Sequence, residues 1–184
     1  VMSVREHKNT SDSMVHLRGE IRSPGPVVPR GFLVVATPKN RSSFAKIPDG
    51  ASGRLQLAKW VASSDNPLTA RVFVNRIWHH LFGQGIVRST DNFGKMGDRP
   101  SHPKLLDYLA QFFIQNKWSV KLLIRKVVLT NTYKMSSSQD LKKDSNNELF
   151  SRQNRRRLEA EAIRDAILLT TGKISFENSE INEN

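Results

Sequence analysis

Apolar residues recur at helical spacing through most of the chain after residue 51. In the clearest case, 66–82, the apolar side chains fall on one face of a helix. This segment opens with Asn66-Pro67, a favoured helix start, and Gly83 is placed to end it. The same spacing predicts helices over 54–62, 101–113, 119–128 and 155–171, with Ser101 and Ser119 as caps.

Three of the predicted helices carry a further expectation. The segment after Ser119 contains several β-branched residues, which lower helix propensity, so a strand is the alternative there. The 66–82 helix is expected to bury Ala70, Phe73, Val74, Ile77, Trp78 and Leu81. The last helix is expected to bury a stripe of Leu158, Ala162, Ala166 and Leu169.

The first 50 residues have a different pattern. They hold five of the eight prolines, and two short apolar runs, 14–17 and 32–35, suit strands. Between these runs lies Ser23-Pro24-Gly25-Pro26, which is a strong turn signal. Because two strands alone are marginally stable in water, we expect a small antiparallel arm that packs on the rest of the chain.

The predicted elements give a mainly α fold, with about five helices in a single domain and a small N-terminal β arm. We expect an entry segment at 1–50, a helical domain at 51–175 and a polar tail at 176–184. The Gly- and Asp-rich segment 83–101 is long for a loop in a compact domain, and such loops are often functional. Residues 134–147 are rich in Ser and Lys and are predicted to form an exposed loop.

The charge of the chain favours anionic partners. Its 184 residues carry 29 Lys and Arg against 17 Asp and Glu, a formal net charge of +12. Such an excess speeds encounter with nucleic acid, anionic glycan or anionic lipid, although proteins that bind none of these also show it. The absence of cysteine excludes disulfides, thiolate metal sites and covalently attached haem. The chain opens at Val1 without a visible signal peptide or a membrane-spanning apolar run, so we expect a fragment of a longer protein.

Polar residues gather on the clearest of the predicted helices. Arg71, Asn75 and His79 share one face at four-residue spacing, and Arg76 and His80 lie beside them. This pattern indicates either a site for an anion or polar ligand, or a polar face bonded to neighbouring loops. Adjacent His79 and His80 point about 100° apart on a helix, which disfavours a metal site.

A basic stripe follows further along the chain. Lys117, Lys121 and Arg125 lie at four-residue spacing, with Lys126 beside them and no acidic residue between 117 and 139. This arrangement suits a phosphate or sulfate polymer, and it equally suits a solvated helix face.

The segment 155–165 alternates positive and negative charges. Arg157 and Glu161 are spaced to pair across one helical turn, which indicates a structural role for the arginines. Glu159 and Glu161 diverge on a helix, and this argues against a catalyst built from paired carboxylates.

Sequence signatures of common enzymes are missing. There is no G-x-S-x-G elbow, no G-x-x-x-x-G-K-[ST] loop and no H-E-x-x-H. The enzyme hypothesis that remains is an acid–base pair of Asp91 and His102 in the 83–102 loop, with a neutral or capping His102 as its alternative. We therefore predict no catalytic residue, no metal and no cofactor in this chain.

Four ordered motifs resemble a known family. They are the segments 66–78, 81–87 with 91–94, 101–107 and 155–161. Together they are similar to the planctomycete-specific domain one family, a domain of unknown function, and Leu17-Arg18-Gly19 resembles the family's entry segment. Family members continue past the last helix into a Gly-Gly-Pro segment, so the resemblance implies a truncated copy.

The resemblance implies an exported, extracytoplasmic protein that also carries a cytochrome-c-like domain, which would hold any haem. It implies no activity and no catalytic residue. Our leading hypothesis is a non-catalytic structural or binding domain, whose ligand is an anionic glycan or a partner domain. One alternative is sequence-blind nucleic-acid binding through 117–126 and 155–157. The other is an enzyme with acid–base groups in the 83–102 loop.

Overall fold

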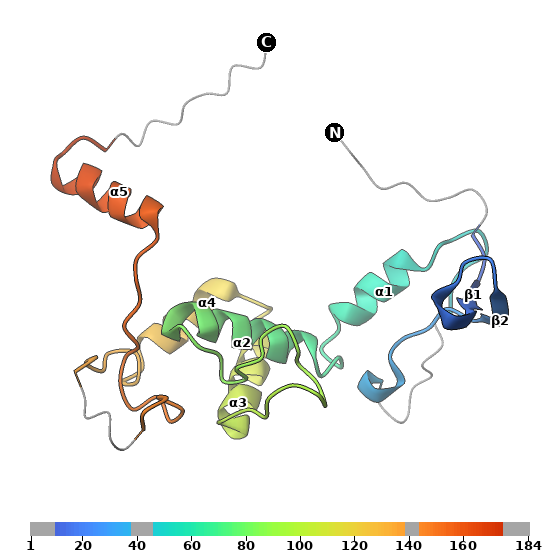
Figure 1. The fold of residues 1–184 in the computed structure, drawn as a ribbon, viewed down its shortest axis with the longest axis horizontal. Helices are drawn as coiled ribbons and strands as arrows, with labels where there is room; N and C mark the ends of the chain where they lie inside the picture. Colours follow the sequence, from blue (N-terminus) through green and yellow to red (C-terminus); the bar gives the residue numbers. More distant parts are fainter. Residues whose placement is uncertain (1–9, 38–45, 139–143, 175–184) are drawn as a thin grey trace, which may run out of the picture. The chain divides into compact units, whose positions relative to one another are not determined.

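The computed structural model describes residues 10–37, 46–138 and 144–174 of the chain (Figure 1). Over these residues the fold is mainly α, with five α-helices and a two-stranded antiparallel sheet near the N-terminus, as the sequence predicts. The chain divides into two compact units, residues 1–134 and 135–184. The predicted tail at 176–184 lies outside the described residues, and the boundaries predicted after residues 50 and 175 stay predictions.

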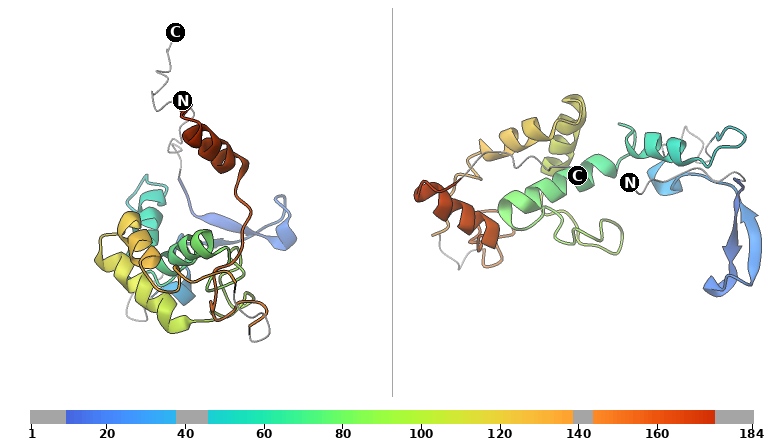
Figure 2. Two further views of the ribbon diagram at one scale, coloured as in Figure 1. Left: turned by 90° about the vertical axis from the view of Figure 1, so that its left-hand side faces the viewer. Right: turned by 90° about the horizontal axis from the view of Figure 1, so that it is seen from above.

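The two strands form a hairpin arm in the first unit. Strand β1 (Ser13–His16) pairs antiparallel with β2 (Pro24–Val28), and Met14 lies opposite Val27 (Figure 2). The strand predicted at 14–17 is therefore confirmed. The one predicted at 32–35 is wrong, because Val34–Ala36 is a single turn of 3-10 helix.

The chain reverses at a different place from the predicted turn. Arg18 and Gly19 have left-handed backbones with φ of 54° and 78°, and the N–H of Leu17 donates to the Ser23 carbonyl at 3.0 Å. The Pro-Gly-Pro sequence lies in β2 instead. Proline has no N–H to donate, so it is tolerated in an edge strand, and both strands of a two-stranded sheet are edges.

Arg30 ties the arm to the segment before the first helix. Its Nε donates to Asp12 Oδ1 at 2.9 Å, and its Nη1 donates to the Ala51 carbonyl at 2.8 Å. The side-chain hydrogen bond from Arg30 holds the pKa of Asp12 below its usual value. These bonds join three separate stretches of the first unit: the residue before β1, the segment after β2 and the segment before α1.

Four helices of the first unit form where the sequence predicts them. They are α1 (Arg54–Val61), α2 (Thr69–Phe82), α3 (Pro103–Gln115) and α4 (Val120–Val128). The Asn66 Oδ1 accepts the N–H of Leu68 at 2.9 Å, and Gly83, with φ of 81°, ends α2 by donating to the His79 carbonyl. Gly83 therefore acts as the predicted stop signal. The predicted start is wrong, because α2 begins at Thr69 with Leu68 at its N-cap position, and Asn66 and Pro67 lie before the helix.

The two predicted serine caps differ in outcome. Ser119 Oγ accepts the N–H of Leu122 at 3.4 Å, and the segment that follows is helical, so the strand alternative is wrong. Ser101 does not cap α3. Its hydroxyl donates to the Ile86 carbonyl at 3.2 Å, and His102 takes the N-cap position, where its side chain does not cap the helix.

The core of the first unit lies where α2, α3 and α4 meet (Figure 2). Its fully or nearly buried side chains include Val74, Trp78, Phe82, Leu106, Leu109, Phe113, Leu123 and Val127. The rings of Trp78 and Phe82 stack with centroids 4.2 Å apart. The prediction that Phe73 is buried is wrong: it is 38% exposed and stacks on Phe113 with centroids 5.1 Å apart.

The second unit contains α5 (Ala160–Thr170) and the loop before it. The helix begins later than the predicted 155, and none of its residues is buried. The expected inner stripe is therefore wrong, since Leu158 and Leu169 are both exposed. The described part of this unit has no second helix or strand on which α5 can pack.

Asn147 and Arg152 organise the loop 144–154. The buried Asn147 amide donates to the Arg152 carbonyl at 2.8 Å, and the Arg152 guanidinium donates to the carbonyls of Asp144 and Ser145 at 2.6 and 2.8 Å. The Asp144 carboxylate accepts the N–H groups of Glu148 and Leu149. Desolvation by burial raises the pKa of Asp144, but these two bonds, the Ser151 hydroxyl and the Arg152 charge together outweigh it and leave the pKa below its usual value.

Candidate functional site

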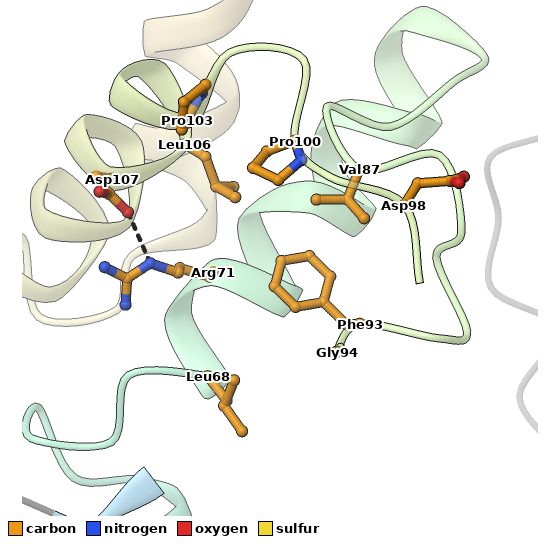
Figure 3. Close-up of a pocket in the computed structure, with 10 residues that line it drawn as sticks. All are labelled: Leu68, Arg71, Val87, Phe93, Gly94, Asp98, Pro100, Pro103, Leu106 and Asp107. Atoms are coloured by element: carbon orange, nitrogen blue, oxygen red, sulfur yellow. Dashed lines mark hydrogen bonds and ion pairs between the residues drawn. The ribbon is translucent and has the colours of Figure 1, made fainter. Parts of the chain in front are cut away.

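A pocket of about 270 Å³ opens between the start of α2, the 83–102 loop and the start of α3 (Figure 3). We call it the Arg71 pocket. It is lined by Leu68, Arg71, Val87, Phe93, Gly94, Asp98, Pro100, Pro103, Leu106 and Asp107. Figure 3 shows Arg71 and Asp107 pointing toward one another, with Asp98 on the far side of the apolar residues. The pocket is therefore an apolar hollow with charged groups at two of its edges.

The ion pair in this pocket links α2 to α3. Arg71 Nε donates to Asp107 Oδ1 at 2.7 Å, and Arg71 Nη1 donates to the Pro67 carbonyl at 2.6 Å. The lining holds one arginine and two aspartates, so the local charge is negative although the whole chain is positive. This charge does not favour an anion, and a ligand-binding role for Arg71 stays a prediction.

Asn75 positions the loop that forms one wall of the pocket. Its Nδ2 donates to the Val87 carbonyl at 2.9 Å, and its Oδ1 accepts the Val87 N–H at 2.8 Å. Gly85 passes so close that an added Cβ would meet the Val87 carbonyl and both amide atoms of Asn75. The Ser101 N–H also donates to the Ile86 carbonyl at 2.9 Å. The loop predicted at 83–102 is thus irregular but fixed to α2, and a ligand role for Asn75 stays a prediction.

A second hollow of about 350 Å³ lies on the other side of Leu68, between α1 and α2. We call it the Trp60–Phe73 groove. It is lined by Leu33, Trp60, Val61, Asn66, Leu68, Thr69, Val72, Phe73 and Arg76. Trp60 also stacks on Phe32, with ring centroids 5.1 Å apart. Arg76 is the charged residue of this groove, and it is exposed.

The histidines do not converge. The rings of His79 and His80 meet edge-on, with centroids 5.9 Å apart and planes at 76°. The Nδ1 of His79 is buried and makes no hydrogen bond with the described residues. His102 lies at the start of α3, where its Nδ1 is 3.0 Å from Ser101 Oγ. Asp91 lies exposed on a turn, and its acid–base role with His102 stays a prediction.

The basic stripe lies only partly on α4. Lys121 and Arg125 are exposed on α4, and Lys126 lies over the ring of Tyr108, with its Nζ 5.9 Å from the centroid. Lys117 precedes the helix and has a left-handed backbone with φ of 54°, so it does not share the face of Lys121.

Arg157 is exposed and lies before α5, outside the helix. Its predicted pairing with Glu161 across one helical turn is therefore wrong. Each of these basic residues stays a candidate ligand contact.

Sequence reasoning did not find several residues of the two hollows. The sequence assigns no site role to Asp98, Asp107 or Trp60, and it places Phe73 on a buried helix face. Asp107 lies 36 positions from its partner Arg71, and such a distant pair leaves no local spacing to detect. The available signal was the motif 101–107, which marks the segment without indicating its partner.

Neither a membrane span nor a metal cluster is found in the described ranges. Over 10–37, 46–138 and 144–174, no helix is long and apolar enough to cross a membrane. Over the same ranges, no three or more His, Asp or Glu side chains are grouped in a way that could hold a metal ion.

Comparison with known proteins identifies the family. Residues 53–182 match the model of the PSD1 family, described as a protein of unknown function (DUF1553). No curated protein and no solved structure matches the chain. The match covers α1 to α5 and includes the Arg71 pocket and most of the Trp60–Phe73 groove. The chain therefore belongs to the PSD1 (DUF1553) family.

Proposed function

We propose that this chain is a non-catalytic binding domain of an exported multidomain protein. In this proposal it binds a partner domain through the apolar surface of α1 and the Trp60–Phe73 groove. The extracytoplasmic location, and a cytochrome-c-like neighbour that would carry any haem, rest on the family resemblance given above.

Helix α1 is the observation that carries the proposal. None of its eight residues is buried, and Leu55 and Leu57 are 60% and 49% exposed. Leu57, Trp60 and Val61 follow the spacing of a single helix face, and the last two line the groove. Isolated helices shorter than about 12 residues are marginal in water, so a surface that covers this face would stabilise α1. Contiguous exposed apolar patches of this kind mark protein-binding sites.

The polar groups near the pocket support a non-catalytic role. Arg71 is bonded to Asp107 and to the Pro67 carbonyl, and both ends of the Asn75 amide are bonded to Val87. Groups used in this way hold the fold and are not available to move protons on a substrate.

Calorimetric titration tests the proposal. The 184-residue chain would be titrated with each other domain that its gene encodes, purified separately. We expect saturable binding that Leu57→Ser weakens at least about tenfold. Leu149→Ser, which changes an exposed leucine of the second unit, is expected to leave binding unchanged. A gene without a further domain, or binding that is insensitive to Leu57→Ser, would refute the proposal.

An anionic glycan is the second candidate ligand, and α4 favours it. The helix carries Lys121, Arg125 and Lys126 without an acidic residue, and the adjacent ring of Tyr108 is 51% exposed. Positive charge next to an exposed aromatic ring suits a sulfated sugar polymer.

Heparin and duplex DNA, titrated from low to high salt, separate these ligands. Glycan binding predicts that heparin stays bound at about 0.15 M salt, DNA does not, and the double variant Lys121→Gln/Arg125→Gln loses heparin. The control double variant is Lys95→Gln/Arg99→Gln, which removes two exposed charges from the loop. DNA binding that persists would support the nucleic-acid alternative. Loss of both polymers at that salt would reject both.

A further inference from the structure

The Trp60–Phe73 groove offers a single charged group to a partner. The side chains of Asn66 and Thr69 in its lining are already bonded within the protein. The Asn66 amide accepts the N–H of Leu68 and donates to the Trp60 carbonyl, at 2.9 and 3.4 Å. The Thr69 hydroxyl donates to the Val61 carbonyl at 2.7 Å. The groove therefore presents aliphatic and aromatic side chains, among them the Trp60 indole, and one guanidinium.

That guanidinium belongs to Arg76. Among the described residues, none forms a hydrogen bond or ion pair with it. Arg76 follows Phe73 and Val72 by three and four positions on α2, so all three lie along one side of the groove. In this respect it differs from Arg71, which Asp107 neutralises.

We propose that this groove binds an acidic, apolar segment of the partner, with a bulky apolar side chain in the groove and an Asp or Glu carboxylate on Arg76. The inference rests on the proposed function and deepens it. A guanidinium presents two parallel N–H donors that match a carboxylate. The net charge of +12 also disfavours a basic segment and favours an acidic one.

The size of the groove favours a side chain over a cofactor. At about 350 Å³ it is at the lower end of the range for small-molecule sites. It is also open, because Leu33, Val61 and Phe73 all remain exposed. An open, shallow apolar groove beside a single charged group is the kind of surface that receives part of a peptide or helix.

Two matched peptides test the charge requirement on the 184-residue chain. One is acetyl-Leu-Phe-Glu-Asp-amide and the other is acetyl-Leu-Phe-Gln-Asn-amide, which has the same shape without the carboxylates. Binding would be followed by NMR, through the Nε–H signal of Arg76 and the indole N–H signal of Trp60. We expect the acidic peptide to shift both signals and to bind about two- to fivefold more tightly than the neutral one, the range for an exposed ion pair.

Variants of exposed residues keep the test independent of folding. Arg76→Gln is expected to remove the preference for the acidic peptide, whereas Arg99→Gln, which removes an exposed charge from the 83–102 loop, is expected to preserve it. Equal affinities for the two peptides, or a preference that survives Arg76→Gln, would overturn the inference. If Leu57→Ser still weakened the binding of a partner domain in that case, the proposed function would stand and only the acidic segment would be rejected. Absence of binding by either peptide would also overturn the inference.

Discussion

Of the contacts between α2 and the 83–102 loop, we expect the bonds of the Asn75 amide to contribute most to the unfolding free energy. The bonds from Asn75 to Val87 are 2.9 and 2.8 Å long, and both residues are buried. In Asn75→Ala, the N–H and the carbonyl of Val87 lose these hydrogen-bond partners but remain buried. An unsatisfied buried group costs about 1–3 kcal/mol, so two give about 2–6 kcal/mol of unfolding free energy.

Urea unfolding followed by tryptophan fluorescence measures this loss, because Trp78 is buried on the same helix. The matched control is Asn92→Ala, which truncates an exposed asparagine of the same loop. We expect the control to change the unfolding free energy by less than about 0.5 kcal/mol. Equal losses in the two variants would refute the reasoning.

Asn75→Asp adds a pH dependence with a defined sign. The carboxylate still accepts the Val87 N–H, but its second oxygen faces the Val87 carbonyl, where only a protonated carboxyl can donate. Folding then favours the protonated form, so the pKa of the introduced carboxyl is raised above its unfolded value of about 3.9. The variant should approach the wild type below about pH 4 and lose stability as pH rises through the raised pKa. A pH-independent difference from the wild type would contradict this geometry.

Three further predictions concern other contacts. Arg71→Met and Asp107→Asn, combined in a double-mutant cycle by urea unfolding, should give a coupling below about 1 kcal/mol because both side chains are partly exposed; a coupling above about 2 kcal/mol would contradict this. Gly97→Ala places a Cβ against the loop backbone and should lower the unfolding free energy, measured by urea unfolding, by about 1–3 kcal/mol. Gly94→Ala, where the space is open, should lower it less. The carboxylate of Asp144, whose pKa is lowered, stabilises its loop above the unfolded pKa, so amide-exchange protection in 144–154 should fall as pH drops below about 4; protection that is constant down to pH 2 would contradict this.

The helices were predictable because their signals are local. Gly83 ends α2 and Ser119 caps α4 as expected, since a cap needs only the residues of its own turn. The presence of a β arm and its first strand were predictable, but its turn and its second strand were not. Its reversal depends on the left-handed conformation of Arg18 and Gly19, whereas the proline-rich segment has a composition that suits both a turn and an edge strand.

Burial was less predictable than helix formation. The apolar spacing of α5 indicates a buried face, but a helix buries that face only where another element lies against it. Phe73 shows the same limit, because one side of its ring stacks on Phe113 while the ring still borders the groove. The apolar residues that the proposal assigns to a partner were therefore indistinguishable, in the sequence, from residues of the core.

The polar residues of α2 show why a shared helix face does not define a site. Arg71 turns to α3, Asn75 holds the 83–102 loop, and Arg76 borders the groove beside α1. Their spacing predicts a shared polar face, but the partner of each depends on segments up to 36 positions away. Arg71 and Asn75 are bonded within the protein, whereas Arg76 faces an apolar groove without an acid to balance it among the described residues. Since no described residue bonds to Arg76, its guanidinium is the group from which we infer the chemistry of the partner.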